Sequence, residues 1–301
     1  MTVDVMWRKN RRTHLPNSTT GGSPHGSCVG VDLNRNYNFL WDFSTYFNPS
    51  SPVSDSNYPC DYQVYHGPAA FSEPESKNAK WIFDNFPNIR FFVDLHSYSE
   101  DILYSWGDDD DQTNDPSMNF KNPAFNGLRG ITNDSAYMEY IPSSDLTLAI
   151  DLANNFRDGI QSVRGTTYIV KPSMGLYPTA GSSDDYAYSR HFIDSSKEKV
   201  IAYTLEWGKE FQPPYTEMYN IIQDITSGLI TFCIWVCNNS LNLRLSKLEN
   251  MVESLQSQIT QLHKTRSIGI RRKISSKRAK TAGSSKIKTK WKSVKKKAKK
   301  K

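Results

Sequence analysis

His96 ends a run of apolar residues in the segment FFVDLHSYSED at 91–101. A neutral imidazole at the end of a strand suits a metal ligand, because the strand fixes the ring while the following loop shapes a cleft. A lone histidine in such a place is, however, more often a hydrogen-bonded core residue. His96 by itself therefore leaves both interpretations open, and the rest of the chain must decide between them.

Three charged residues elsewhere could take part in chemistry, although each also has an ordinary structural interpretation. Glu206 follows YTL at the end of an apolar run, where a carboxylate commonly forms a salt bridge. Arg8 lies in the basic cluster RKNRR, which water can solvate. Asp184 follows GSS at the expected start of a helix, where aspartate is a good capping residue, and we expect the adjacent Asp185 to take the capping role.

The elements that would position these residues alternate between helix and strand. Ser72 followed by Glu75 is the pattern of a capping box at the start of a helix. Helices are expected at 72–86 and 147–163, and strands at 89–98, 166–170 and 200–207. Strands that alternate with helices predict an α/β fold built on a sheet.

Charge divides the chain into an acidic body and a basic tail. Of the 37 Lys and Arg residues, 18 lie at 264–301, which holds no Asp or Glu, so residues 1–263 carry 19 basic and all 31 acidic residues. The tail has few apolar residues and is expected to be disordered. It predicts affinity for nucleic acid or another polyanion without sequence selectivity.

No segment is expected to span a membrane. The most apolar stretch, GLITFCIWVC at 228–237, is shorter than the roughly 18 residues that a span requires. We predict that it belongs to a buried helix whose apolar face includes Ile225 and Phe232, with Cys233 and Cys237 as reduced core thiols. The first residues, MTVDVMWRKNRR, contain no apolar stretch of a secretory signal.

Apolar residues repeat at alternating spacings of four and three over 241–262, which is the pattern of a coiled-coil seam. Leu245, Val252 and Ile259 fall at a positions and leucines at d positions, an arrangement that favours a parallel dimer. Because the repeat is short, the helix could instead pack on its own domain. We therefore expect a body at 1–239, a coiled-coil helix at 240–263 and a tail at 264–301.

The acidic segment DDDDQTND at 108–115 places Asp109, Asp111, Thr113 and Asp115 at alternate positions, as in the first half of a calcium-binding loop. The glycine and the distal glutamate that would complete such a loop are missing. We therefore expect a solvated acidic loop.

Six segments resemble the zinc metallocarboxypeptidase family, of the carboxypeptidase A, B and T type. They occur in the family's order between about residues 7 and 236: MWRKNRR, GVDLNRNYNFLW, YHGPAAFSEPE, VDLHSYSEDILYSWG, GLYPTAGSSDDYAY and YTLEWGKEFQPP. The resemblance implies a mixed β-sheet flanked by helices, incomplete on its N-terminal side.

The resemblance also implies a metal. Family members hold a catalytic Zn²⁺ through two histidines and a glutamate, and His96 matches the last of these ligands. The other two ligands form a His-x-x-Glu motif upstream of Trp-Arg-Lys, and none of the 6 histidines here is followed by glutamate three residues later. By resemblance, one zinc ligand is present, two are missing, and roughly the first third of the domain is absent. Asp32 matches the carboxylate that orients the first zinc histidine.

Further residues match the family's catalytic and substrate-binding positions. Glu206 matches the general base that deprotonates the zinc-bound water, and Arg8 the arginine that stabilises charge on the scissile carbonyl oxygen. Asn34 and Arg35, within DLNRNY, match the pair that binds the C-terminal carboxylate of a peptide, for which a planar guanidinium is suited. Tyr177 matches the mobile tyrosine that closes over the bound end.

Specificity and compartment also follow from the resemblance. Asp184 falls at the floor of the family's side-chain pocket, where a carboxylate implies a basic or a mixed basic and apolar preference. Cys28 and Cys60 match a disulfide of animal members, which requires an oxidising compartment. These features imply an extracellular location, whereas the lack of a signal peptide and the basic tail are compatible with the nucleus.

Two functions follow from the sequence. The first is zinc-dependent hydrolysis of the C-terminal residue of peptides, which a chain lacking the His-x-x-Glu ligands would not perform. The second is binding without catalysis. Such a protein would bind peptide or protein C-termini, form a homodimer through 241–262, and bind nucleic acid or another polyanion through 264–301.

Overall fold

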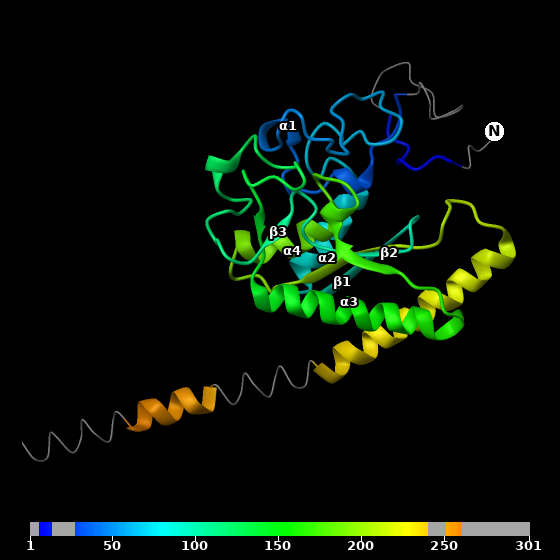
Figure 1. The fold of residues 1–301 in the computed structure, drawn as a ribbon. Helices are drawn as coiled ribbons and strands as arrows, with labels where there is room; N and C mark the ends of the chain where they lie inside the picture. The colour runs from blue at the N-terminus through cyan, green and yellow to red at the C-terminus, as the bar shows by residue number, and fades with distance from the viewer. Residues whose placement is uncertain (1–5, 14–27, 240–250, 261–301) are drawn as a thin grey trace, which may run out of the picture. The chain divides into compact units, whose positions relative to one another are not determined.

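The computed structural model describes residues 6–13, 28–239 and 251–260. Contacts divide the chain into two compact units, Met1–Trp235 and Val236–Lys301, and each is described by itself. The first unit has the expected α/β architecture, in which helices flank a mixed sheet (Figure 1).

A four-stranded sheet of order β1-β6-β2-β5 forms the centre of the first unit. Its strands are β1 (Phe91–His96), β2 (Asp101–Tyr104), β5 (Ile169–Pro172) and β6 (Ile201–Glu206). β6 runs parallel to β1 and antiparallel to β2, which runs parallel to β5. β6 is buried along its whole length because it has a neighbour on each side. β1, which its apolar sequence predicts to be buried, lies at the edge of the described sheet and is only half-buried.

The two faces of the sheet are covered by different helices, because successive side chains of a strand point to opposite faces. On one face, Phe92 packs against Phe83 of α2 (Pro74–Asn85), and Asp94 accepts a hydrogen bond from Ser183 of α4 (Ser183–Ile193). On the other face, Phe91 contacts Phe232 of the helix Tyr215–Asn239. Phe232 also packs against α3 (Ser143–Arg164), which covers this face over β2, β5 and β6.

Short elements connect these layers. They are η1 (Leu33–Arg35), α1 (Phe43–Tyr46), β3 (Asp111–Gln112), η2 (Pro123–Phe125), β4 (Glu139–Tyr140) and η3 (Ser173–Gly175). The capping box expected at Ser72 is wrong: Glu73 occupies the N-cap of α2, and the Ser72 hydroxyl donates to the Glu73 carboxylate instead. α3 ends at Arg164 because Gly165 adopts a left-handed φ of 84°, which glycine permits without a Cβ clash.

The helix Tyr215–Asn239 is not the buried helix that its composition predicts. Ile225 and Phe232 face the core, but the side chains of Ile230 and Ile234 are 55% and 56% exposed. Cys233 and Cys237 are free and exposed, so their assignment as core thiols is wrong. By length and hydropathy alone this helix could cross a membrane, a property that it shares with core helices of soluble proteins.

The acidic segment at 108–115 is not a solvated loop. Asp108 and Asp109 are 0% and 1% exposed. The Asp109 carboxylate accepts hydrogen bonds from the backbone N–H groups of Asp110 and Gly130, at 2.8 and 2.7 Å. These carboxylates thus organise the turn from inside, whereas Asp115 at its far end is exposed.

The pairing of Cys28 with Cys60 is confirmed. The bond closes a loop of 32 residues around the segment that contains η1. In the chain-entropy model, a loop of this length stabilises the fold by about 3 to 4 kcal/mol.

Among the described residues, the second unit contains the end of the helix Tyr215–Asn239, from residue 236, and a helix at 251–260. The predicted seam residues Val252, Leu255 and Ile259 are about half exposed, at 50%, 51% and 53%. The remainder of the predicted seam and the basic tail at 264–301 lie outside the described residues.

Candidate active site

The site lies where β1 and β6 end. Because the two strands are parallel and in register, His96 at the end of β1 pairs directly with Glu206 at the end of β6. The carboxyl ends of parallel strands commonly carry functional groups, since the loops that follow them form a crevice. The start of α4 and the η1 segment reach the same edge.

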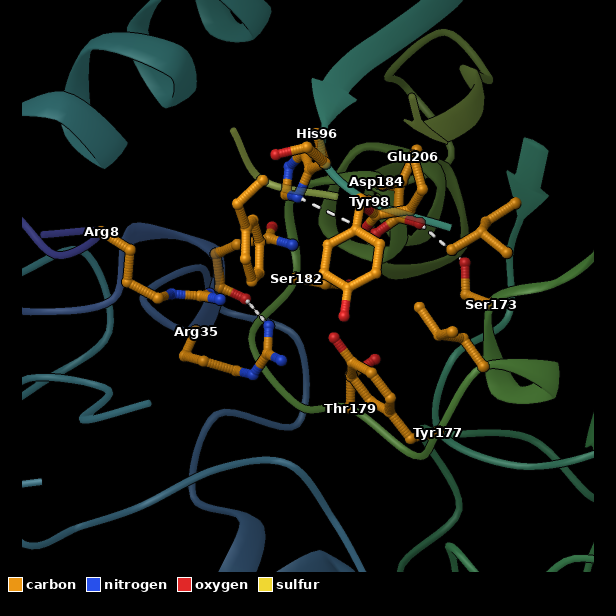
Figure 2. A pocket seen from close by; sticks show the side chains of 16 residues that line it. Arg8, Arg35, His96, Tyr98, Ser173, Tyr177, Thr179, Ser182, Asp184 and Glu206 are labelled. Carbon is orange, nitrogen blue, oxygen red and sulfur yellow. Dashed lines mark hydrogen bonds and ion pairs between the residues drawn. The ribbon is translucent and has the colours of Figure 1, made fainter. Parts of the chain in front are cut away.

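One cavity of about 260 Å³ lies at this edge (Figure 2). All seven residues that the sequence assigns to catalysis, substrate or metal line it: Arg8, Asn34, Arg35, His96, Tyr177, Asp184 and Glu206. Side chains from five separate segments are therefore brought together, although Arg8 and Glu206 are almost 200 positions apart.

Arg35 is held rigidly at the wall of the cavity. It is 2% exposed, and its Nη1 donates to the Asn34 carbonyl at 2.7 Å. Its Nε donates to the carbonyl of Ser54, and its Nη2 to the Ser54 hydroxyl at 3.2 Å. Asn34 in turn accepts a hydrogen bond at 2.8 Å from the backbone N–H of Ser183, which begins α4. Arg35 and the first turn of α4 are thereby fixed relative to each other.

His96 lies between two carboxylates. Its Nε2 is 3.2 Å from Asp94 Oδ2, and its Nδ1 is 3.7 Å from Glu206 Oε1. Burial opposes the positive charge on the ring, but the hydrogen bond and charge of Asp94, together with the charge of Glu206, raise the pKa of His96. Sequence reasoning missed Asp94, although alternation along the expected strand at 89–98 puts positions 94 and 96 on the same face and was the signal that could have found it.

Glu206 is a nearly buried acid that faces the cavity. Burial raises its pKa, and the positive charges of His96 and Arg8 oppose that shift. Its Oε2 atom has no hydrogen-bond partner among the described residues, which leaves it available to a proton or a ligand. A raised pKa and a free oxygen facing a cavity are properties expected of a carboxylate that acts as a proton acceptor or donor.

Asp184 lies at the inner end of the cavity and Tyr177 at its mouth. Asp184 is 2% exposed, and the Ser173 hydroxyl donates to its Oδ2 at 2.9 Å. Tyr177 is 39% exposed, and the Arg35 guanidinium carbon lies 6.0 Å from the centre of its ring. Ser173 was not identified from the sequence, because a serine in a short turn gives no functional signal there.

Asp185 and Asp32 each accept hydrogen bonds from groups that the sequence did not predict as their partners. The adjacent Asp185 does not cap α4: its Oδ2 accepts a hydrogen bond at 3.0 Å from the backbone N–H of Gly107. Asp32, which matches the family carboxylate beside the first zinc histidine, accepts from Arg8 Nη2 at 2.5 Å and from the Asn34 backbone N–H at 3.1 Å. Asp32 therefore positions Arg8, whose side chain is 42% exposed at the cavity.

The described residues do not fit a complete zinc site. Among them, no group of three or more His, Cys, Asp or Glu side chains is arranged to hold a metal ion. A catalytic zinc site normally uses three protein ligands, and His96 alone of the residues here matches one. Both nitrogens of His96 face carboxylates instead, at the distances given above.

Comparison with known proteins identifies the family. The model of the zinc carboxypeptidase family, Peptidase_M14, matches residues 1–227. The chain belongs to the zinc carboxypeptidase family. This zinc carboxypeptidase homologue is 32% identical over 191 residues to carboxypeptidase B of Bos taurus. The alignment covers 63% of this chain and 34% of that protein. It is 32% identical over 207 residues to carboxypeptidase B of Astacus astacus, covering 68% and 50% respectively.

A solved structure supports the fold of the homologue. Bovine thrombin-activatable fibrinolysis inhibitor, in complex with tick carboxypeptidase inhibitor, aligns with a TM-score of 0.53 and 20% identity. The alignment covers 79% of this chain and 64% of that one. The sequence alignments cover 34% of carboxypeptidase B of Bos taurus and 50% of that of Astacus astacus, so the chain spans between a third and a half of the length of these curated relatives.

Proposed function

We propose that this zinc carboxypeptidase homologue binds the C-terminal end of peptides in the cavity at the ends of β1 and β6. In this proposal, Asn34 and Arg35 hold the terminal carboxylate, and Asp184 receives the side chain of a C-terminal Lys or Arg. The observation that carries it is that a buried guanidinium and a separate buried carboxylate line one cavity of about 260 Å³.

The hydrogen bonds of Arg35 support the carboxylate assignment. The bonds to Asn34 and Ser54 use Nε and one hydrogen on each Nη atom, which leaves one hydrogen on each Nη for the Tyr177 hydroxyl, a further hydrogen-bond partner of the guanidinium, or for a ligand that displaces it. A carboxylate can accept both remaining hydrogens in the bidentate geometry that a planar guanidinium favours. Tyr177, at the mouth, is placed to cover a bound carboxylate.

The surroundings of Asp184 support a basic preference. Its carboxylate accepts a hydrogen bond from the Ser173 hydroxyl and acts electrostatically on His96, but it forms no salt bridge among the described residues. A buried carboxylate without a cationic partner is costly, and a Lys or Arg side chain of a ligand would supply that partner. An apolar side chain would leave the charge unpaired, so the site should discriminate against it.

The test is equilibrium binding of two peptides that end in Arg and differ only in a free carboxylate or a C-terminal amide. We expect the free acid to bind at least tenfold more tightly, and Arg35→Gln to remove most of that difference. Equal binding of acid and amide by the unaltered chain would disprove the proposal.

Hydrolysis of the bound peptide is the second candidate function. It is favoured by one observation, the free Oε2 atom of Glu206 beside His96 in the same cavity. Because the described residues do not fit a three-ligand zinc site, no catalytic step is assigned to them. Stoichiometric zinc in the purified chain, with release of C-terminal Arg that Glu206→Gln abolishes, would establish hydrolysis.

The proposal extends to partners and location. The exposed apolar residues of the helix at 251–260 support a homodimer through the seam at 241–262, and 18 basic residues at 264–301 support polyanion binding. The disulfide supports an oxidising, extracellular compartment. Affinity for heparin that failed to weaken as salt increased would count against the polyanion assignment.

A further inference from the structure

We propose that a buried pair, Asp55 and His66, positions Arg35 for the terminal carboxylate of a bound peptide. The inference rests on the proposed function, because it concerns the geometry of the same carboxylate site. Neither residue lines the cavity. Each would therefore act through Arg35 and not by contact with a ligand.

The first link is Ser54, which fixes two edges of the site. Its carbonyl and hydroxyl oxygens accept from Arg35 Nε and Nη2, and its backbone N–H donates to the Pro178 carbonyl at 2.9 Å. Pro178 directly follows Tyr177 at the mouth of the cavity. A shift of Ser54 would therefore rotate the guanidinium and move the tyrosine loop together.

The second link is Asp55, which determines where Ser54 lies. Its Oδ1 accepts a hydrogen bond at 2.6 Å from the backbone N–H of Ser56, and the same Oδ1 lies 3.1 Å from Nδ1 of His66. The Asp55 side chain is 0% exposed and that of His66 is 6% exposed. Oδ2 of Asp55 has no hydrogen-bond partner among the described residues. Nδ1 of His66 likewise has no well-aligned hydrogen-bond partner among the described residues, so the 3.1 Å approach is the contact through which the imidazole acts on the carboxylate, with Arg35 further away.

The electrostatics of Asp55 agree with this role of the imidazole. Burial raises the pKa of the Asp55 carboxyl, and the hydrogen bond and charge of His66, followed by the charge of Arg35, oppose the rise. Without the imidazole, the carboxyl would take up a proton or move toward water. Either change would release the turn that carries Ser54.

His66 is also tied to Arg35 from the other side. Its carbonyl accepts hydrogen bonds from Asn36 Nδ2 at 2.8 Å and from Trp41 Nε1 at 3.2 Å. Asn36 is the residue directly after Arg35. The His66 ring stacks on Trp41, with ring centres 4.3 Å apart, and meets Phe43 edge-on at 5.6 Å. His66 therefore contacts both neighbours of the Arg35 site. Its carbonyl binds Asn36, which follows Arg35, and its ring lies against Asp55, which follows the Ser54 that accepts from Arg35.

The charged groups around the imidazole are few. Asp55 lies against the ring, the negative charge of Asp42 acts on it from the turn before α1, and Arg35 lies beyond Asp55. The packing around it is otherwise aromatic. The pair reaches Arg35 through Ser54 and does not line the cavity, whereas Asp184 lies on α4, so changes to the pair should affect the carboxylate more than the side-chain pocket.

The experiment measures the ratio of dissociation constants for the amide and the free acid of one Arg-terminated peptide. Asp55→Asn and His66→Gln are compared with the unaltered chain, and Phe43→Leu is the control because Phe43 touches the His66 ring without a polar link. We expect Asp55→Asn and His66→Gln to weaken acid binding about tenfold and to leave amide binding unchanged, so that the ratio falls tenfold. Phe43→Leu should keep the ratio. Thermal unfolding shows that each variant is folded, and mass spectrometry shows that the peptides remain intact.

The outcomes separate the inference from the proposed function. If the unaltered chain distinguishes acid from amide but both polar variants keep the ratio, or lose both affinities equally, the positioning role is wrong while the proposed function stands. If the unaltered chain does not distinguish the two peptides, both are wrong. If one polar variant does not fold, the other decides the question, because each removes one side of the same contact.

Discussion

At the scale of single residues, Asp184 gives the sharpest prediction. Replacing it with Asn removes a buried negative charge but keeps the side-chain shape and an acceptor for Ser173. We expect Asp184→Asn to weaken binding of an Arg-terminated peptide by one to two powers of ten, since hydrogen bonds to charged groups contribute about 1.5 to 3 kcal/mol. Binding of a Leu-terminated peptide should be unchanged or improved.

The measurement is titration calorimetry with peptides that differ only in their last residue. Asp194→Asn is a suitable control, because Asp194 is the half-exposed C-cap of α4 and does not line the cavity. A parallel loss for Arg-terminated and Leu-terminated peptides would show that Asp184 supports the cavity without selecting the side chain.

At the scale of elements, α3 and the helix Tyr215–Asn239 approach closely where Gly159 of α3 faces Gly228 of the other helix. A Cβ added to Gly228 would lie 2.6 Å from Phe156 and 2.6 Å from Ile160, both on α3. Such overpacking costs about 1 to 3 kcal/mol, which we expect to exceed the ~1 kcal/mol gained when Ala replaces Gly in a helix. Gly228→Ala should therefore lower the free energy of unfolding in urea. Thr226→Ala, on the exposed side of the same helix, should not lower it.

The helix at 251–260 carries the prediction about assembly. Its apolar side chains are exposed, and one half-exposed residue, Leu255, falls at a d position of the heptad pattern. We expect Leu255→Lys to convert a dimer into a monomer in sedimentation velocity, because a lysine at this position would place like charges opposite each other. Gln256→Lys, outside the seam, should leave the dimer intact. A monomeric unaltered chain at tens of micromolar would contradict the pairing.

At the scale of the whole molecule, the buried acidic turn should make the free energy of unfolding fall as the pH rises. Burial and the charge of Asp108 raise the pKa of Asp109 to about 8, and burial raises that of Glu139 to about 7. The folded state then holds protons that the unfolded chain has lost above about pH 4. This stabilisation is complete below that pH and is lost as the pH rises through 7 and 8.

Urea denaturation between pH 5 and pH 8 tests this dependence. We expect the free energy of unfolding to fall with rising pH, by up to about 1.4 kcal/mol per pH unit for each proton involved. Glu139→Gln should flatten the curve, since glutamine can still accept from the Phe120 N–H and bond the Tyr137 hydroxyl. A stability that rises over this range would show that these carboxyls are ionised in the folded protein.

Sequence patterns were sufficient for much of the fold and the composition of the site. Apolar periodicity located α2, α3, β1, β6 and the helix Tyr215–Asn239 to within a few residues, because period is a local property of the chain. Motif resemblance named seven residues that line one cavity, and it named the disulfide. The strand β2 was missed, since four residues between two loops give little periodic signal.

The sequence by itself predicted which residues line the cavity and, through the resemblance to the family, which of them matches a zinc ligand, because the identity and order of residues are written in the chain. Only the tertiary structure decided the surroundings of those residues. It placed Glu206 beside His96, buried the carboxylates at 108 and 109, exposed Cys233, and linked Arg35 to His66 through Ser54 and Asp55. Burial and charge pairing depend on which distant segments pack together, and no local pattern carries that information.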